Sequence, residues 1–110
     1  MGIEGEPRLD PAALDGLREI GGDELVADLV ETFLADAPAL LATLRGDDVD
    51  EVRRAAHTLK SNGATFGATR LSELSRELED LARTGDLAGA PELADRIDAE
   101  YALVAEELQG

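Results

Sequence analysis

His57 is the only histidine in this chain of 110 residues, which contains no cysteine. On a helical wheel at about 100° per residue, the apolar positions of its segment fall within about 40° of Val52, and His57 lies about 140° away. The side chain is therefore expected to face water. An accessible imidazole is a competent nucleophile near neutral pH, although a lone histidine is also commonly an ordinary surface residue. The neighbouring residues decide between these two interpretations.

Basic and small residues surround His57 on the wheel. Three of the ten basic residues gather on one exposed patch, Arg53, Arg54 and Lys60, and the last of these is the only lysine. Cations one turn away would stabilise the charge of a phosphoryl group attached to the ring. Ser61 and Ala64 are small, so they leave the imidazole open to an approaching partner. The alternative is an ordinary solvated helix face on which the arginines pair with Asp50 or Glu51.

Glycine, proline and acidic caps divide the chain into five predicted helical segments: 10–20, 23–44, 48–66, 68–84 and 91–108. The pair Asp10-Pro11 is typical of a helix start, and Gly21-Gly22 ends the short first segment. Pro38 falls inside the second segment and predicts a kink or a break near Ala37. Residues 1–9 are interpreted as a flexible lead-in.

Each segment carries apolar residues at three- and four-residue spacing, which indicates one buried face per helix. The inward positions are Leu14 and Leu17, with Ile20 as a third candidate, then Val26, Val30, Phe33, Ala37, Leu40, Leu44, Val52, Ala56, Leu59, Gly63, Phe66, Leu71, Leu74, Leu78, Leu81, Leu93, Ile97, Tyr101, Val104 and Leu108. This pattern predicts an all-α fold, an antiparallel up-down-up-down four-helix bundle with the short N-terminal helix as a cover. Residues 10–110 then form one domain. The leucine stripes are too short for a dimer zipper, so we expect a monomer.

The composition excludes several classes of function. With 25 acidic and 10 basic residues, the formal net charge is -15, which disfavours binding to nucleic acid and to anionic membranes. No apolar run approaches the roughly 20 residues of a membrane span, and the N-terminus lacks the features of a signal peptide, so we expect a cytoplasmic protein. One histidine without cysteine excludes an ordinary zinc site, and the acidic run 47–51 lacks the spacing of a calcium loop. No metal site is expected.

The run from Ala56 to Ala68, AHTLKSNGATFGA, resembles the signature of histidine-containing phosphotransfer (HPt) domains. The shared pattern is a histidine, an apolar residue two positions on, a lysine three on, a small residue four on, a glycine ten on and a leucine stripe that ends in Leu-Glu. The matching residues here are His57, Leu59, Lys60, Ser61, Gly67, Leu71, Leu74, Leu78 and Glu79. The lead-in around Asp10-Pro11 and the stretch from Leu29 to Leu34 are also similar, so the resemblance covers nearly the whole chain.

The resemblance implies a phosphocarrier of a two-component phosphorelay, not an enzyme. His57 would accept a phosphoryl group from the aspartyl phosphate of one response-regulator receiver domain and pass it to the aspartate of another, with a hybrid histidine kinase as a further partner. Receivers of this kind supply the Mg²⁺, so no cofactor is expected on this chain. Lys60 and Arg53 would stabilise the phosphoryl group, and Arg54, Ser61 and Ala64 would form the access and docking surface. The structural residues of the motif are Leu59, Gly67, Leu71, Leu74 and Leu78.

Two other interpretations stay open. The chain could be a helical bundle that docks on receivers or kinases and regulates them without carrying phosphate, which phosphate labelling would decide. It could also be a metal-binding or hydrolytic bundle that uses its acidic residues, which metal titration would decide. Within the phosphorelay hypothesis, the direct donor could instead be the catalytic domain of a histidine kinase.

Overall fold

The computed structural model describes residues 7–110, which form four helices and no strand. Helix α1 spans Pro11–Thr43, α2 spans Val49–Thr65, α3 spans Thr69–Arg83 and α4 spans Ala90–Gln109. The helix ends lie close to the predicted boundaries because the predicted capping residues form their hydrogen bonds. Asp10 caps α1 by accepting from the backbone N–H of Ala12, and Asp48 caps α2 in the same way. The prediction of an all-α fold is confirmed.

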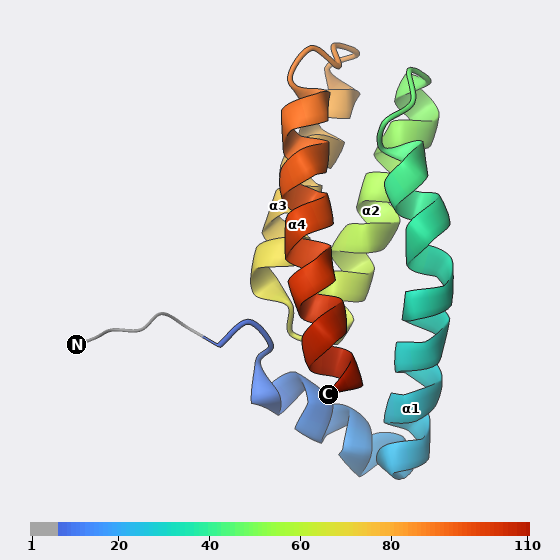
Figure 1. Ribbon diagram of the computed structural model, residues 1–110, viewed down its shortest axis with the longest axis vertical. Coiled ribbons are helices and arrows are strands. Elements are labelled where there is room, and N and C mark those ends of the chain that lie inside the picture. Colours follow the sequence, from blue (N-terminus) through green and yellow to red (C-terminus); the bar gives the residue numbers. More distant parts are fainter. Residues whose placement is uncertain (1–6) are drawn as a thin grey trace, which may run out of the picture.

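Gly22 divides α1 into a short and a long part. Its φ of 73° and ψ of -171° are not helical, and glycine adopts a positive φ without the steric cost that a side chain would add. The short part crosses the lower end of the molecule and the long part then rises along the bundle (Figure 1). The short covering helix predicted from Gly21-Gly22 is therefore present, joined to the next helix by a sharp bend instead of a loop.

The long part of α1 and the helices α2, α3 and α4 run alternately up and down (Figure 1). Each helix packs against the next in the chain, and α1 closes the ring by packing against α4. This is the predicted antiparallel four-helix bundle. Within residues 7–110, no helix combines the length and the apolar character that crossing a membrane requires.

Of the predicted kink or break near Ala37, the break does not occur. Helix α1 continues through Pro38 to Thr43, and Gly22 is its one position with non-helical backbone. Proline removes one hydrogen bond from a helix interior. Apolar side chains on both sides of Pro38, Phe33 and Leu44, are buried in the core, so their packing holds the helix together across the missing bond.

The core is aliphatic and includes one small aromatic cluster. Phe33 of α1 contacts Phe66, which follows α2, and Tyr101 of α4, with ring centroids 5.2 and 5.5 Å apart. The fully buried aliphatic side chains include Leu44, Val52, Leu59, Leu71, Leu78, Ile97 and Val104. The inward position considered for Ile20 is wrong, because this residue is 80% exposed at the end of the short helix.

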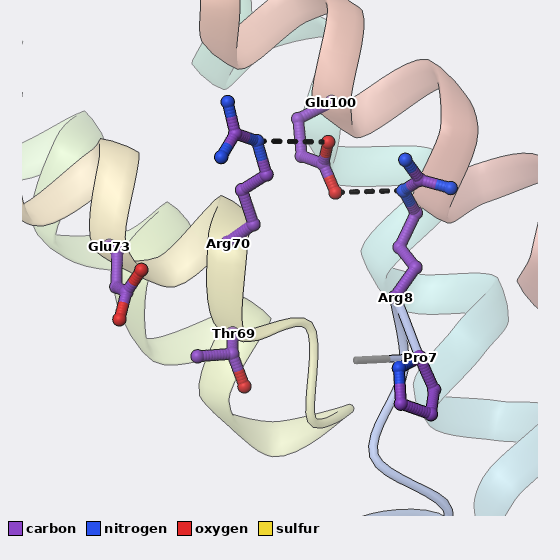
Figure 2. A pocket seen from close by; sticks show the side chains of 6 residues that line it. All are labelled: Pro7, Arg8, Thr69, Arg70, Glu73 and Glu100. Carbon is purple, nitrogen blue, oxygen red and sulfur yellow. Dashed lines mark hydrogen bonds and ion pairs between the residues drawn. The ribbon is translucent and has the colours of Figure 1, made fainter. Parts of the chain in front are cut away.

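The chain before α1 is fastened to the bundle at two points. The backbone N–H of Asp10 donates to the carbonyl of Gly67 at 2.9 Å, and Arg8 Nε lies 2.9 Å from the buried carboxylate of Glu100 in α4. Figure 2 shows Arg8 and Arg70 on either side of that carboxylate. Leu9 packs against the core. Of the predicted flexible lead-in, residues 1–6 lie outside the described residues, but Arg8 and Leu9 are held by contacts.

Helices α2 and α3 approach closely at Gly63. A Cβ atom there would lie 3.1 Å from the backbone nitrogen of Ser72, so a side chain would force the two backbones apart. Nearby, the hydroxyl of Ser72 donates to the carbonyl of Lys60 at 3.0 Å. This contact sets the spacing of the two helices that carry the candidate site.

Candidate functional site

His57 lies on the exposed side of α2, as the helical wheel predicts, with 56% of its side chain accessible. Its Nδ1 atom is 2.8 Å from Oε2 of Glu79 in α3. One ring nitrogen is thus anchored to the neighbouring helix. The other, Nε2, has no hydrogen-bond partner within residues 7–110 and remains available for chemistry.

Glu79 is buried and holds three side chains together. Only 1% of its side chain is accessible, and it contacts Lys60 Nζ through Oε1 at 2.7 Å and Arg83 Nη2 through Oε2 at 3.1 Å, besides His57. Burial by itself would raise the pKa of Glu79, but the contacts with Lys60 and His57 outweigh burial and hold that pKa below its ordinary value. Glu79 is therefore a carboxylate at neutral pH.

The charge of Glu79 determines which nitrogen of His57 carries the proton. An ionised carboxylate can only accept hydrogen bonds, so the Nδ1–H group of His57 must be the donor. In the neutral ring, the lone pair then lies on Nε2. The buried carboxylate thus selects the tautomer in which the free nitrogen, Nε2, carries the lone pair.

The residues predicted to surround His57 occupy three different environments. Lys60 is 28% exposed and its ammonium group is engaged by Glu79. Ser61 and Ala64 are exposed on α2, and both side chains are small. Arg53 is half-buried and Arg54 is exposed, and the ion pairs within residues 7–110 include neither. The alternative pairing with Asp50 or Glu51 is therefore not found.

Arg54 borders a shallow groove between α1 and α2. Leu40, Thr43 and Thr58 line the groove with it, and an adjoining groove shares these same three residues. His57 does not line either groove, and its ring is hydrogen-bonded to α3 instead. Arg54 thus lies at the edge of a partly apolar groove on the side of α2 that faces α1.

The motif residues interpreted as structural lie beneath this surface. Leu59, Leu71, Leu74 and Leu78 are buried in the core, and Gly67 lies in the short connection between α2 and α3 with a φ of 70°. No group of three His, Cys, Asp or Glu side chains within residues 7–110 is arranged to hold a metal ion.

Glu79 and Arg83 are the two site residues to which the sequence pattern assigns no role. Glu79 stands at the end of the leucine stripe, directly after Leu78, and enters the pattern only as part of a motif. A glutamate next to a buried stripe, with a single histidine in the preceding helix, is a signal that points to a pair. Nothing in the pattern marks Arg83, which is one of several exposed arginines.

These features define a helical bundle that presents one oriented and accessible imidazole on its surface. The family model described as "Hpt domain" matches residues 28–107. The chain belongs to the Hpt domain family and is a histidine phosphotransfer protein of a phosphorelay.

Two relatives illustrate the similarity. The "Phosphorelay protein LuxU" of Vibrio cholerae is 31% identical over 83 residues, which cover 72% of this chain and 74% of that protein. The crystal structure of histidine-containing phosphotransfer protein B (HptB) from Pseudomonas aeruginosa PAO1 superposes with a TM-score of 0.86 at 32% identity. That superposition covers 96% of this chain and 94% of HptB, so the likeness includes the covering helix.

Replacing Lys60 tests the cation on Oε1. In Lys60→Ala this buried oxygen loses its ion pair and has no hydrogen-bond partner to replace it, so we expect a loss of about 1–3 kcal/mol in the free energy of unfolding. Phosphotransfer should slow roughly tenfold, because the carboxylate that orients His57 is no longer fixed. Urea unfolding and quench-flow transfer measure the two effects, and Lys60→Arg should retain most of both. Wild-type stability and transfer rate in Lys60→Ala would show that Lys60 has no role in holding Glu79.

The lowered pKa of Glu79 predicts an acid-sensitive contribution to stability. A carboxyl group whose pKa is lower in the folded state stabilises the protein at any pH above its pKa in the unfolded state. This contribution is lost as the pH falls through the pKa of the folded state. The contribution of Glu79 should therefore be constant from neutral pH down to its ordinary value of 4.5 and decrease below that. Unfolding of wild type and Glu79→Gln should differ in this dependence on pH. Glu77→Gln, an exposed change in the same helix, is the control and should follow the wild type.

Proposed function

We propose that His57 is the phosphoacceptor of this protein and that Nε2 is the atom that carries the phosphoryl group. The proposal depends on one observation: the only histidine of the chain is exposed, and a buried carboxylate holds its Nδ1–H. A histidine phosphotransfer protein requires a histidine that a partner can reach, and the chain offers no other.

The transfer is a displacement at phosphorus. The Nε2 lone pair attacks the phosphorus of an aspartyl phosphate in a receiver domain, a bond from nitrogen to phosphorus forms, and the bond between phosphorus and the aspartate oxygen breaks. The donor leaves as a free carboxylate. The ring becomes positively charged while Nδ1–H is retained, and the negative charge of Glu79 stabilises it. Transfer to a second receiver reverses these steps, so the bundle acts as a carrier without catalytic groups for hydrolysis.

The docking face lies around Ser61 and Ala64 and along the groove beside Arg54. Ser61 and Ala64 are small and exposed on the helix that carries His57, which suits a domain that brings its own reactive aspartate. We place the Mg²⁺ of the reaction on the receiver, and we propose that the bundle works as a cytoplasmic monomer with receiver domains and a hybrid histidine kinase as partners.

Transfer of labelled phosphate decides this proposal. The protein is mixed with a panel of receiver domains labelled on aspartate and, separately, with histidine kinase catalytic domains and ATP. We expect label to pass from at least one receiver to this chain and then to a second receiver. Binding to receivers without any transfer would support the alternative of a regulator that carries no phosphate.

The size of residue 61 tests the direction of approach. Ser61 lies one turn beyond His57 on the exposed face, so Ser61→Phe should block transfer by steric overlap with the receiver while the fold survives. Ser61→Gly should still transfer phosphate, with a stability loss of about 0.5–1 kcal/mol from glycine in a helix interior. Transfer assays and urea unfolding measure these outcomes. Normal transfer by Ser61→Phe would show that receivers approach from another side.

A further inference from the structure

Arg83 contacts the same carboxylate oxygen that anchors the nucleophile. Its Nη2 atom lies 3.1 Å from Oε2 of Glu79, and His57 Nδ1 lies 2.8 Å from that oxygen. Arg83 is the last residue of α3, one turn after Glu79, and 58% of its side chain is accessible. Its remaining ion-pair contact, with the exposed Asp80, is longer at 3.9 Å.

We propose that Arg83 is a positioning residue for phosphotransfer, which acts on His57 through Glu79. The inference rests on the proposed function in one respect, namely that His57 is the phosphoacceptor. Arg83 holds Oε2 in the orientation in which this oxygen accepts from Nδ1–H, while Lys60 holds Oε1. The carboxylate is thereby fixed at both oxygens by cations from two helices.

The geometry explains why two cations are needed. The terminal torsion of a glutamate is broad, so a carboxylate held at one oxygen can turn about that contact. With Arg83 removed, Lys60 is the only cation on Glu79, and rotation toward its ammonium group weakens the hydrogen bond to His57. A neutral imidazole in water prefers its proton on Nε2. When the hydrogen bond at Nδ1 is weaker, more of the neutral ring carries its proton on Nε2. The fraction of His57 with a free lone pair on Nε2 therefore falls.

A purely structural role for Arg83 makes a different prediction. A basic residue in the last turn of a helix stabilises the helix dipole, and a surface pair four residues apart contributes a few tenths of a kcal/mol. Either effect changes the free energy of unfolding but leaves the tautomer of a folded His57 unchanged. The tautomer thus separates the two roles.

The experiment uses the single histidine of the chain, whose two ring nitrogens give one set of imidazole signals in a long-range ¹H–¹⁵N spectrum. In the wild type, we expect the proton on Nδ1. In Arg83→Ala, we expect signals shifted toward the Nε2-protonated form and a transfer rate from a labelled receiver reduced about fivefold. Arg83→Lys should recover part of both, because an ammonium group four residues on still reaches Glu79.

Arg76→Ala is the matched control, since Arg76 is exposed on the same helix and forms no ion pair within residues 7–110. It should show the wild-type tautomer and rate. The inference is overturned if Arg83→Ala keeps the wild-type tautomer, whether or not its transfer slows. The absence of label on wild-type His57 would instead overturn the proposed function, and the tautomer measurement would still decide the role of Arg83.

Discussion

His57→Gln should carry no phosphoryl group after incubation with a labelled receiver that fully labels the wild type. The chain has no second histidine, and an amide side chain has no nucleophilic lone pair comparable to Nε2. Label on the wild type should be labile in acid and stable in base, as expected of a bond between phosphorus and nitrogen. Gel electrophoresis after acid and base treatment measures both properties.

The fold of His57→Gln should be close to that of the wild type. The histidine side chain is 56% accessible, and the contact it loses is its hydrogen bond to Glu79, which keeps Lys60 and Arg83. We therefore expect a loss of about 1–2 kcal/mol in the free energy of unfolding without a change of fold. Circular dichroism and thermal unfolding check this. Label on the variant that survives acid would show that another residue accepts the phosphoryl group.

Among substitutions of a turn glycine by alanine, we expect Gly67→Ala to cause the largest loss in the free energy of unfolding. Gly67 has a φ of 70°, which costs a residue with a side chain about 1–2 kcal/mol. An added Cβ would also lie 2.8 Å from the backbone nitrogen of Asp10, the residue that caps α1. We expect a total loss of about 2–3 kcal/mol, measured by urea unfolding, because the covering helix must shift.

Gly85→Ala separates the two causes. Gly85 has a φ of 82°, but no atom lies within 4 Å of the position that an added Cβ would occupy, so only the backbone cost applies. Its expected loss is about 1–2 kcal/mol. Equal losses for the two variants would show that the contact between Gly67 and Asp10 contributes nothing to stability.

The sequence predicts the helices well because their signals are local. Asp10 and Asp48 cap the helices they precede, and Gly67 adopts the left-handed backbone that ends α2. The exposure of His57 also follows from local geometry, since the apolar stripe of α2 fixes its rotation. These features can be predicted from the residues of a single helix and its ends.

The environment of His57 could not be predicted in the same way. Its bond to Glu79 joins residues 22 positions apart and depends on the distance between α2 and α3, which the backbone contact at Gly63 sets. The place of Glu79 after the leucine stripe points to a pair with His57, but periodicity does not give the distance between the two helices. Pro38 is a related case, because tertiary packing on both sides outweighs the local tendency to break the helix.

The close contact of α2 with α3 has a consequence for how the chain folds. These helices are consecutive and joined by a short turn, so their contacts close small loops at low entropic cost. The contacts of Asp10 with Gly67 and of Arg8 with Glu100 span 57 and 92 residues and close large loops. We expect the hairpin that aligns His57 with Glu79 to form in the transition state and the N-terminal cover to dock after it. Weakening the cover should then speed unfolding and leave the folding rate nearly unchanged.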